Sequence, residues 1–372
     1  MSSVMRQPLL MIPGPTDAPE EVLRRCGLPV FPHYEGDFAV FYDQLVHKMA
    51  DVFGLTDGQV HLPIGSGTTA INMMLASLCT PDDSILIINN GYWGSFAERN
   101  ASSLGIPYVS LASGHGTPYD ADAVRAEMER GRHRFIYVTH NESAAAIVNP
   151  LPPLGQLAIE YDALLLVDSV SAVGGMVIDM DAAGADAVAG ASQKCLELPP
   201  GLALVAVGSR ARQYMSGMTD RRVPLLLDLM AWQESFETRH DWHPQPFTGA
   251  ANLLYALDWM ADQIREEGLA NRQERFRAAG QRLKSGFSDL GFTATAGPRI
   301  ASPVVTEFRM PDGRSAEDLR AYYLAEHNIM VGRGQGPETG PADAHIRVAH
   351  FGRSAEPERI DLLIDITRDF MG

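Results

Sequence analysis

The chain has 372 residues, of which 45% are hydrophobic and 20% are charged, a composition typical of a soluble globular protein with two domains. The formal net charge of −16 argues against binding to nucleic acid or to an anionic membrane surface. No apolar stretch approaches the ~18 residues of a membrane span, and the three cysteines form neither a C-x-x-C pair nor a metal pattern with histidine. We therefore expect a cytoplasmic protein with no membrane anchor, nucleic-acid partner or metal site.

The N-terminal region reads as an arm over residues 1–20, because Pro13 and Pro15 end its short apolar run and make a rigid turn. A short helix is expected at 18–25. A longer helix is expected from Asp37 to Phe53, whose apolar residues recur at helical spacing.

A loop of small residues, Gly65-Ser66-Gly67-Thr68-Thr69, lies between a strand-like run at 61–64 and a helix pattern at 70–78. Free backbone N–H groups at the positive end of a helix dipole suit a phosphate. The hydroxyls of Ser66 and Thr68 can add donors. The loop is neither a Walker A nor a G-x-G-x-x-G motif, so by itself it is a weak indication of phosphate binding.

Strand-like runs and helix patterns then alternate, which predicts a mainly parallel sheet covered on both faces. The runs are 85–88, 108–111, 135–139, 163–167, 186–189 and 202–207. Ligands in such sheets bind at the carboxyl ends of the strands. The candidate groups at these ends are residues 66–68, the turn at 90–93, residues 140–143, Asp168 and Lys194.

Asp168 and Lys194 carry the chemical hypothesis. Asp168 closes an apolar run, where an unpaired buried carboxylate is costly, and Lys194 follows a second run. Pyridoxal phosphate chemistry needs such a pair: a lysine that binds the cofactor covalently and a carboxylate beside the pyridinium nitrogen. The alternative is a strand-end aspartate and an ordinary surface lysine.

After residue 210 the pattern turns helical, with a long helix pattern from 250 to about 276, and a smaller unit begins near residue 285. Strand patterns at 304–309, 329–331 and 346–349 and helix patterns at 316–326 and 357–370 indicate a second α/β unit. We predict an arm (1–20), a large domain (21–284) and a small domain (285–372).

The chain resembles the class V aminotransferases, which are fold-type I pyridoxal phosphate enzymes, and most of all their alanine–glyoxylate and serine–pyruvate branch. The resemblance covers nearly the whole chain. It runs from Pro13-Gly14-Pro15 to Ile346-Arg347-Val348. It rests on four motifs taken in order: residues 65–68, Asn90-Gly91-Tyr92-Trp93-Gly94, Asp168-Ser169-Val170-Ser171 and Ser192-Gln193-Lys194-Cys195-Leu196. It implies an α/β fold in which helices sandwich a mainly parallel seven-stranded sheet, followed by a small C-terminal domain.

The resemblance also implies roles for single residues. Lys194 would be the Schiff-base lysine and proton shuttle, and Asp168 would pair with the pyridinium nitrogen. Trp93 would stack on the ring; otherwise it is a core tryptophan beside a tight turn. Ser66, Gly67, Thr68 and Gln193 would lie at the phosphate, Ser143 near the phenolic oxygen, and Arg347 would clamp the substrate carboxylate. Arg333 is a second candidate for substrate binding.

The implied reaction is ping-pong transfer of an amino group from a small amino acid or amine to a small 2-oxo acid, glyoxylate or pyruvate, in a homodimer with sites at the subunit interface. The C-terminal part around both arginines also resembles pyridoxamine–pyruvate aminotransferase. Three features depart from the family pattern: Ala144-Ala145-Ala146 replaces polar residues, the segment 241–244 lacks the expected Tyr and Thr, and Arg333 is an added cation. Transamination of pyridoxamine, an aminophosphonate or ureidoglycine therefore stays open. Cysteine desulfuration or lyase chemistry is a weaker alternative, and a non-catalytic nucleotide-binding module is the weakest.

Overall fold

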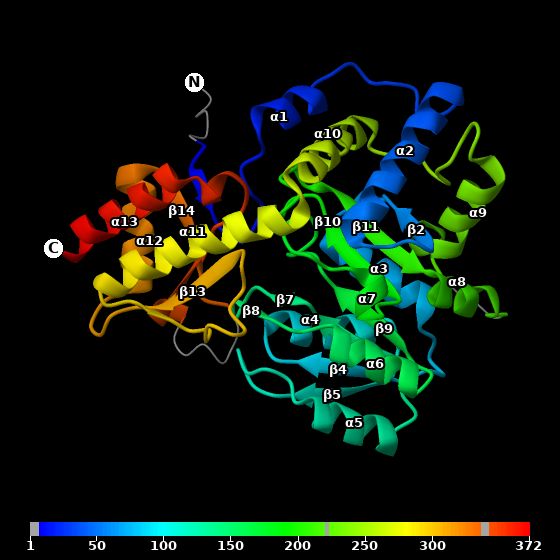
Figure 1. Ribbon diagram of the computed structural model, residues 1–372, viewed down its shortest axis with the longest axis horizontal. Helices are drawn as coiled ribbons and strands as arrows, with labels where there is room; N and C mark the ends of the chain where they lie inside the picture. Colours follow the sequence, from blue (N-terminus) through cyan, green and yellow to red (C-terminus); the bar gives the residue numbers. More distant parts are fainter. Residues whose placement is uncertain (1–6, 220–222, 336–341) are drawn as a thin grey trace.

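The computed structural model describes residues 7–219, 223–335 and 342–372. Two α/β units lie side by side, and the helix α11 (Leu269–Asp289) runs from the larger unit into the smaller one (Figure 1). Every helix in these ranges lacks either the length or the apolar character that a membrane span requires.

The large sheet follows the predicted alternation. Its order is β2 (Gly58–His61), β11 (Gly201–Gly208), β10 (Ala187–Ala191), β9 (Leu164–Asp168), β6 (Phe135–Thr139), β4 (Ile85–Asn89) and β5 (Tyr108–Ala112). The strands from β10 to β5 pair in parallel, and β11 is antiparallel to both of its neighbours. The two-residue strand β3 (Ile64–Gly65) also pairs with β11. The prediction of a mainly parallel seven-stranded sheet is confirmed, with β3 as an addition.

Helices cover both faces of this sheet. Alternate residues of β4 enter two different cores: Leu86 and Ile88 pack on one face, and Ile85 and Ile87 on the other. The first core contains residues of α1 (Glu20–Cys26), α2 (Gly36–Phe53), α5 (Ala121–Arg130), α6 (Pro152–Glu160), α7 (Met180–Ala183) and α10 (Ala251–Glu267). The second contains residues of α3 (Gly67–Leu78), α4 (Tyr92–Ser103), α8 (Ser209–Ser216) and α9 (Leu229–Arg239), with a 3-10 turn, η1 (Leu225–Leu227), packed against it.

The long helix expected from 250 to 276 is two helices. Gly268 has φ +79° and ends α10, and α11 then begins at Leu269 and continues to Asp289. Glycine adopts a positive φ without steric cost, so this residue sets the break. The predicted domain boundary after residue 284 falls inside α11.

The smaller unit has a five-stranded sheet with the order β1 (Leu9–Met11), β14 (Ile329–Arg333), β15 (His345–Ala349), β13 (Val305–Arg309) and β12 (Thr293–Ala294). Helices α11, α12 (Ala316–His327) and α13 (Pro357–Met371) and the 3-10 turns η2 (Ala342–Ala344) and η3 (Gly352–Ala355) complete it. The N-terminal arm therefore supplies an edge strand to this sheet, because β1 pairs in parallel with β14. A short hairpin of β7 (Asn141–Glu142) and β8 (Ile147–Val148) lies between the two units (Figure 1).

Candidate active site

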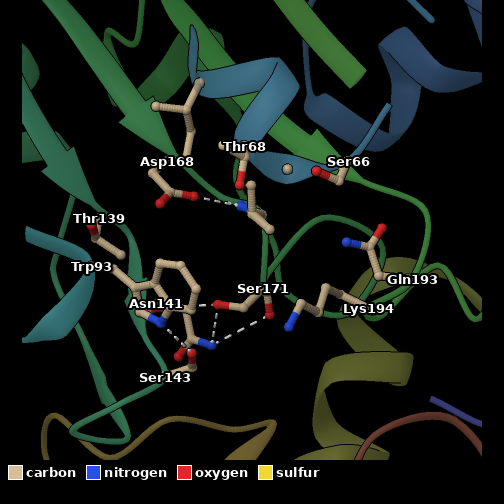
Figure 2. Close-up of a pocket in the computed structure, with 13 residues that line it drawn as sticks. Ser66, Thr68, Trp93, Thr139, Asn141, Ser143, Asp168, Ser171, Gln193 and Lys194 are labelled. Atoms are coloured by element: carbon tan, nitrogen blue, oxygen red, sulfur yellow. Dashed lines mark hydrogen bonds between the residues drawn. The ribbon is translucent and has the colours of Figure 1, made fainter. Parts of the chain in front are cut away.

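A pocket lies at the carboxyl ends of β6, β9 and β10, where the sequence placed its candidate groups. It is lined by Ser66, Gly67, Thr68, Ile71, Trp93, Thr139, Asn141, Ser143, Asp168, Val170, Ser171, Gln193 and Lys194. Figure 2 shows Ser66 and Thr68 at one end, Asp168 and Trp93 along one side, and the Lys194 amine reaching in from the other. Nine of the ten predicted site residues thus lie on or beside this pocket; Arg333, described below, does not.

One end of the pocket is the start of α3. The Ser66 backbone N–H donates to Thr69 Oγ1 at 3.1 Å, which fixes the loop as the helix begins. A Cβ at Gly67 would lie 2.5 Å from Val170 Cγ1, so only glycine lets the helix start approach the segment that follows Asp168. The N-terminus of a 12-residue helix, with two adjacent hydroxyl-bearing residues, suits a phosphate.

Asp168 is the last residue of β9 and is buried. Burial raises the pKa of its carboxyl to about 6, while the Val170 N–H, at 2.9 Å from Oδ1, and the charge of Lys194 act in the opposite direction. A carboxylate held in this environment gains free energy from a cationic partner, such as a protonated pyridine nitrogen.

Lys194 follows β10 and lies half-buried beside the N-terminal arm. Its amine donates to the carbonyl oxygen of Pro13 at 2.6 Å. Burial and then the positive charge of Arg347 lower the pKa of Lys194 to about 8, although Asp168 opposes this effect. A primary amine with a lowered pKa is a nucleophile and a general base near neutral pH.

Trp93 is oriented by two neighbours on the loop that follows β6. Its indole N–H donates to Ser143 Oγ at 2.9 Å, and its backbone N–H donates to Glu142 Oε2 at 2.8 Å. Glu142 also accepts from Gly94 and Ala144, so its buried carboxylate fixes both the start of α4 and the loop after β7. Burial raises the pKa of Glu142 to about 7, and these three N–H donors limit the rise. Its role could not be read from the sequence, where it is simply one residue of the 140–143 segment.

Arg347 and Arg333 lie on neighbouring strands but point to different places. Arg347 is buried and donates from Nε to the Arg333 carbonyl at 2.8 Å and from Nη1 to the Ser143 carbonyl at 3.1 Å, which places it behind the pocket wall. Arg333 has an exposed side chain that pairs with Glu317 of α12 at 2.7 Å. The structure therefore does not bring the Arg333 side chain into the pocket.

Several buried polar atoms on the pocket wall have no hydrogen-bond partner within the described residues: Thr139 Oγ1, Asn141 Oδ1 and Gln193 Oε1. Buried polar groups are rarely left unpaired, so these atoms indicate a polar ligand. Together with a helix start that suits a phosphate, an indole, a buried carboxylate and a lysine amine form a set of groups that fits pyridoxal phosphate. The sequence reasoning assigned no individual role to Thr139, which ends β6, or to Asn141 and Ser171, although Asn141 belongs to the candidate segment 140–143 and Ser171 to the motif that begins at Asp168.

Comparison with known proteins agrees with this geometry. Residues 30–355 match the aminotransferase class-V family. The chain is 31% identical to an uncharacterized aminotransferase of Methanocaldococcus jannaschii (94% of this chain, 89% of the relative), and 29% identical to the alanine–glyoxylate aminotransferase of Rattus norvegicus (97% and 87%). It is 28% identical to the pyridoxamine–pyruvate transaminase of Mesorhizobium japonicum (92% and 86%).

Among solved structures, the alanine–glyoxylate aminotransferase of Nostoc sp. superposes with a TM-score of 0.94 at 27% identity, covering 100% of this chain and 97% of that one. The resemblance seen in the sequence motifs and the expected fold class are both confirmed. With a family match over most of its length and a pocket that fits the cofactor, the chain belongs to the class V aminotransferases, which depend on pyridoxal phosphate.

Proposed function

We propose that this enzyme transfers an amino group from a small amino acid to a small 2-oxo acid, glyoxylate or pyruvate, with ping-pong kinetics. The relatives named above include alanine–glyoxylate and pyridoxamine–pyruvate enzymes, which supports 2-oxo acids as acceptors. Bound pyridoxal phosphate supplies an electron sink and a carrier for the amino group. The protein supplies the binding, the orientation and the proton transfers.

Asp168 would hold the proton on the pyridine nitrogen of the cofactor. Its carboxylate is buried at the end of β9, where the rigid strand fixes it. Ser66, Gly67 and Thr68 would hold the phosphate, and Gln193, whose Oε1 has no partner among the described residues, would lie beside it. Trp93, fixed by Glu142 and Ser143, would stack on one face of the ring and exclude water from it.

Lys194 would bind the cofactor and then, as a free amine, move a proton to and from the substrate Cα. Its lowered pKa of about 8 keeps part of the amine neutral at physiological pH. Arg347 would bind the substrate carboxylate. Two of its nitrogens already bond to backbone carbonyls, and its Nη2 makes no hydrogen bond within the described part of the chain.

One observation carries the proposal: the buried carboxylate of Asp168 and the half-buried amine of Lys194 line the same pocket beside the start of α3. The test is a screen of half-reactions. The purified cofactor-bound enzyme is mixed with single amines, including alanine, serine, ureidoglycine, pyridoxamine and an aminophosphonate, and the visible absorbance is followed. A small amino acid should bleach the band, and glyoxylate or pyruvate should restore it. Lys194→Ala is the matched control, and turnover of this variant near the wild-type rate would overturn the assignment.

Two other chemistries are less well supported. Desulfuration needs an accessible reactive thiol, whereas burial raises the pKa of both Cys79 and Cys195, and Cys26 is half-buried with a raised pKa as well. Use of free pyridoxamine as a substrate would not require a phosphate-binding helix start, and this chain keeps one at Ser66 to Thr68.

A homodimer is part of the proposal. Val30 (85% exposed), Phe31, Tyr34 and Trp242 form an exposed apolar surface, and the Glu35 N–H to Trp242 carbonyl bond joins the two segments that carry it. Light scattering should give twice the monomer mass, and Val30→Asp should lower it, whereas Ile159→Asp, at an exposed position on α6, should not. A monomeric wild type would contradict this part. The three free thiols support a cytoplasmic location.

A further inference from the structure

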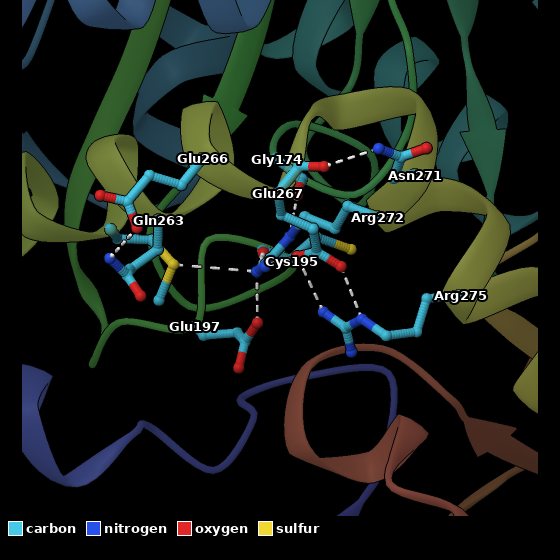
Figure 3. Close-up of polar contacts among 10 residues, drawn as sticks. Gly174, Cys195, Glu197, Gln263, Glu266, Glu267, Asn271, Arg272 and Arg275 are labelled. Atoms are coloured by element: carbon cyan, nitrogen blue, oxygen red, sulfur yellow. Dashed lines mark hydrogen bonds and ion pairs between the residues drawn. The ribbon is translucent and has the colours of Figure 1, made fainter.

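A buried arginine outside the pocket connects the two segments that carry the main site residues. Arg272 lies in the first turns of α11 and is 4% exposed. Its Nε donates to the Gly174 carbonyl at 2.8 Å, and its Nη2 donates to the Cys195 carbonyl at 3.3 Å and to the Glu197 carboxylate. Nη1 donates to Glu267 at 2.9 Å (Figure 3).

The two carbonyls belong to different loops of the site. Gly174 follows the segment that begins at Asp168, and Cys195 is the neighbour of Lys194. These loops are packed so closely that a Cβ at Gly174 would lie 2.6 Å from Leu196 Cδ2, and a Cβ at Gly175 would lie 2.6 Å from Cys195 Cβ. The fork of one guanidinium therefore ties the loop after Asp168 to the loop after Lys194.

Glu197 adds a second constraint on the lysine loop. Its backbone N–H donates to the Lys194 carbonyl at 2.9 Å. The φ of Glu197 is +57°, a left-handed conformation that is unfavourable for a residue with a side chain and persists only where the surrounding structure holds it in place. The small unit supplies part of those surroundings, because a Cβ at Gly352 in η3 would lie 2.6 Å from the Glu197 carboxyl carbon. A buried charged pair is strongly perturbed when one partner is removed.

We propose that Arg272, on the connecting helix α11, and its partner Glu197, on the loop after Lys194, are positioning residues that fix Lys194 relative to Asp168. This inference rests on the proposed function, because Lys194 and Asp168 act as described only when the cofactor binds between them. Arg272 contacts neither the pocket nor a substrate; it acts through the two loops.

The test compares Arg272→Met, Arg272→Lys and Glu197→Gln with Arg275→Met. Arg275 is a matched control, because it lies one turn further along α11, pairs with the same Glu267 and lies over the same Phe276 ring, yet bonds to neither loop. Each protein is studied at a temperature where circular dichroism shows it folded. The readouts are kcat and KM, and the rate at which apoprotein captures pyridoxal phosphate as a function of pH.

We expect Arg272→Met and Glu197→Gln to lower kcat by on the order of 100-fold with KM within about twofold, since a misplaced catalytic group costs about that much. The midpoint of the plot of capture rate against pH should also move toward higher pH. Lys194 would lose its fixed surroundings, and with them part of the burial that lowers the pKa of its amine. Arg272→Lys should recover only part of the loss, as an ammonium cannot reach both carbonyls. Arg275→Met should match the wild type in both readouts.

Wild-type kcat and an unmoved capture midpoint in folded Arg272→Met would overturn the inference, and so would full recovery in Arg272→Lys. If Arg272→Met does not fold, Arg272→Lys and Glu197→Gln decide on the same readouts. The capture assay needs no amino donor. A shift in its midpoint without turnover of any tested donor would therefore reject the proposed substrates and retain the positioning role.

Discussion

The Lys194 amine donates a hydrogen bond to the Pro13 carbonyl, 2.6 Å away, across a sequence separation of 181 residues. The next residue, Gly14, has φ +124°, and a Cβ there would lie 2.5 Å from both Nζ and Cδ of Lys194. The N-terminal arm therefore forms part of the wall around the lysine.

Gly14→Ala should consequently displace Lys194. We expect the affinity of the apoprotein for pyridoxal phosphate to fall by at least about tenfold, which corresponds to about 1.4 kcal/mol. Gly313→Ala is the control, since it imposes an alanine at φ +78° where a Cβ would meet nothing within 4 Å. Equal losses in the two variants, measured by titration of the visible band, would show that backbone strain alone is responsible.

The lowered pKa of Lys194 predicts a pH profile. Lowering the pKa from 10.5 to about 8 raises the neutral fraction of the amine at pH 7 by about 300-fold. The neutral amine is the reactive form, so capture of pyridoxal phosphate should accelerate as pH rises and level off above about pH 8. N-acetyl-lysine methyl ester, measured in parallel, should keep accelerating to about pH 10. If the pH profile of the protein coincided with that of the ester, the pKa of Lys194 would not be lowered by its surroundings.

Asp168→Asn should retain some cofactor but lose most activity, because a neutral amide does not hold the pyridinium proton. We expect kcat to fall at least about 100-fold, a rise in the barrier of about 2.7 kcal/mol. Asp186→Asn is the control. Burial also raises the pKa of Asp186 to about 6, but this residue precedes β10, at the amino ends of the parallel strands and away from the pocket, and it pairs with Arg210. Near-normal single turnovers in Asp168→Asn would assign Asp168 a structural role.

Arg347→Ala should raise KM for both amino and oxo acids while leaving the visible spectrum unchanged. Loss of a charge-assisted clamp from a partly closed site costs on the order of 2–4 kcal/mol, or about 30- to 900-fold in affinity. Arg333→Ala should change KM by less than about twofold, since its exposed side chain pairs with Glu317. Should Arg347→Ala keep KM for glyoxylate and pyruvate within about twofold, the carboxylate is bound elsewhere.

Glu142→Gln should loosen Trp93. The carboxylate accepts three backbone N–H groups through two oxygens, and an amide replaces one acceptor by a donor that faces an N–H. An unpaired buried donor costs about 1–3 kcal/mol, so cofactor affinity should fall on the order of tenfold. Glu98→Gln should have no such effect, because Glu98 lies on α4, the helix that carries Trp93, but bonds to Asn89 and Ser110. If Glu142→Gln bound pyridoxal phosphate as tightly as the wild type, the contact between Glu142 and Trp93 would not contribute to cofactor binding.

Much of the fold was predictable because its signals are local. The alternation of apolar runs and helix patterns predicted the sheet. Because the strands of a parallel sheet run in the same direction, their carboxyl ends lie at the same edge, which brings Asp168 and Lys194 together. The break at Gly268 was missed because a single glycine is tolerated within a helical pattern, and only its φ reveals the turn.

The non-local parts of the site were not predictable in the same way. Arg333 and Arg347 are close in sequence and on paired strands, yet one side chain is buried near Ser143 and the other pairs with α12 on the surface. Alternation predicts that Arg347 faces away from Ile346, but not which residues cover that face. Arg272 is one of many charged residues of α11 until the fold places it against two loops from another part of the chain.

The pairing of Leu9 with Ile329 has a consequence for the order in which the protein can be made. During synthesis the arm leaves the ribosome long before its partner strand β14, because the two strands lie far apart in the sequence. Until β14 emerges, β1 has no sheet to join and Pro13 has no fixed position from which to contact Lys194. Lys194 can therefore reach its final surroundings only after β14 has been made, so a chain truncated before β14 would contain every residue that lines the pocket and still lack a fixed contact between Pro13 and Lys194.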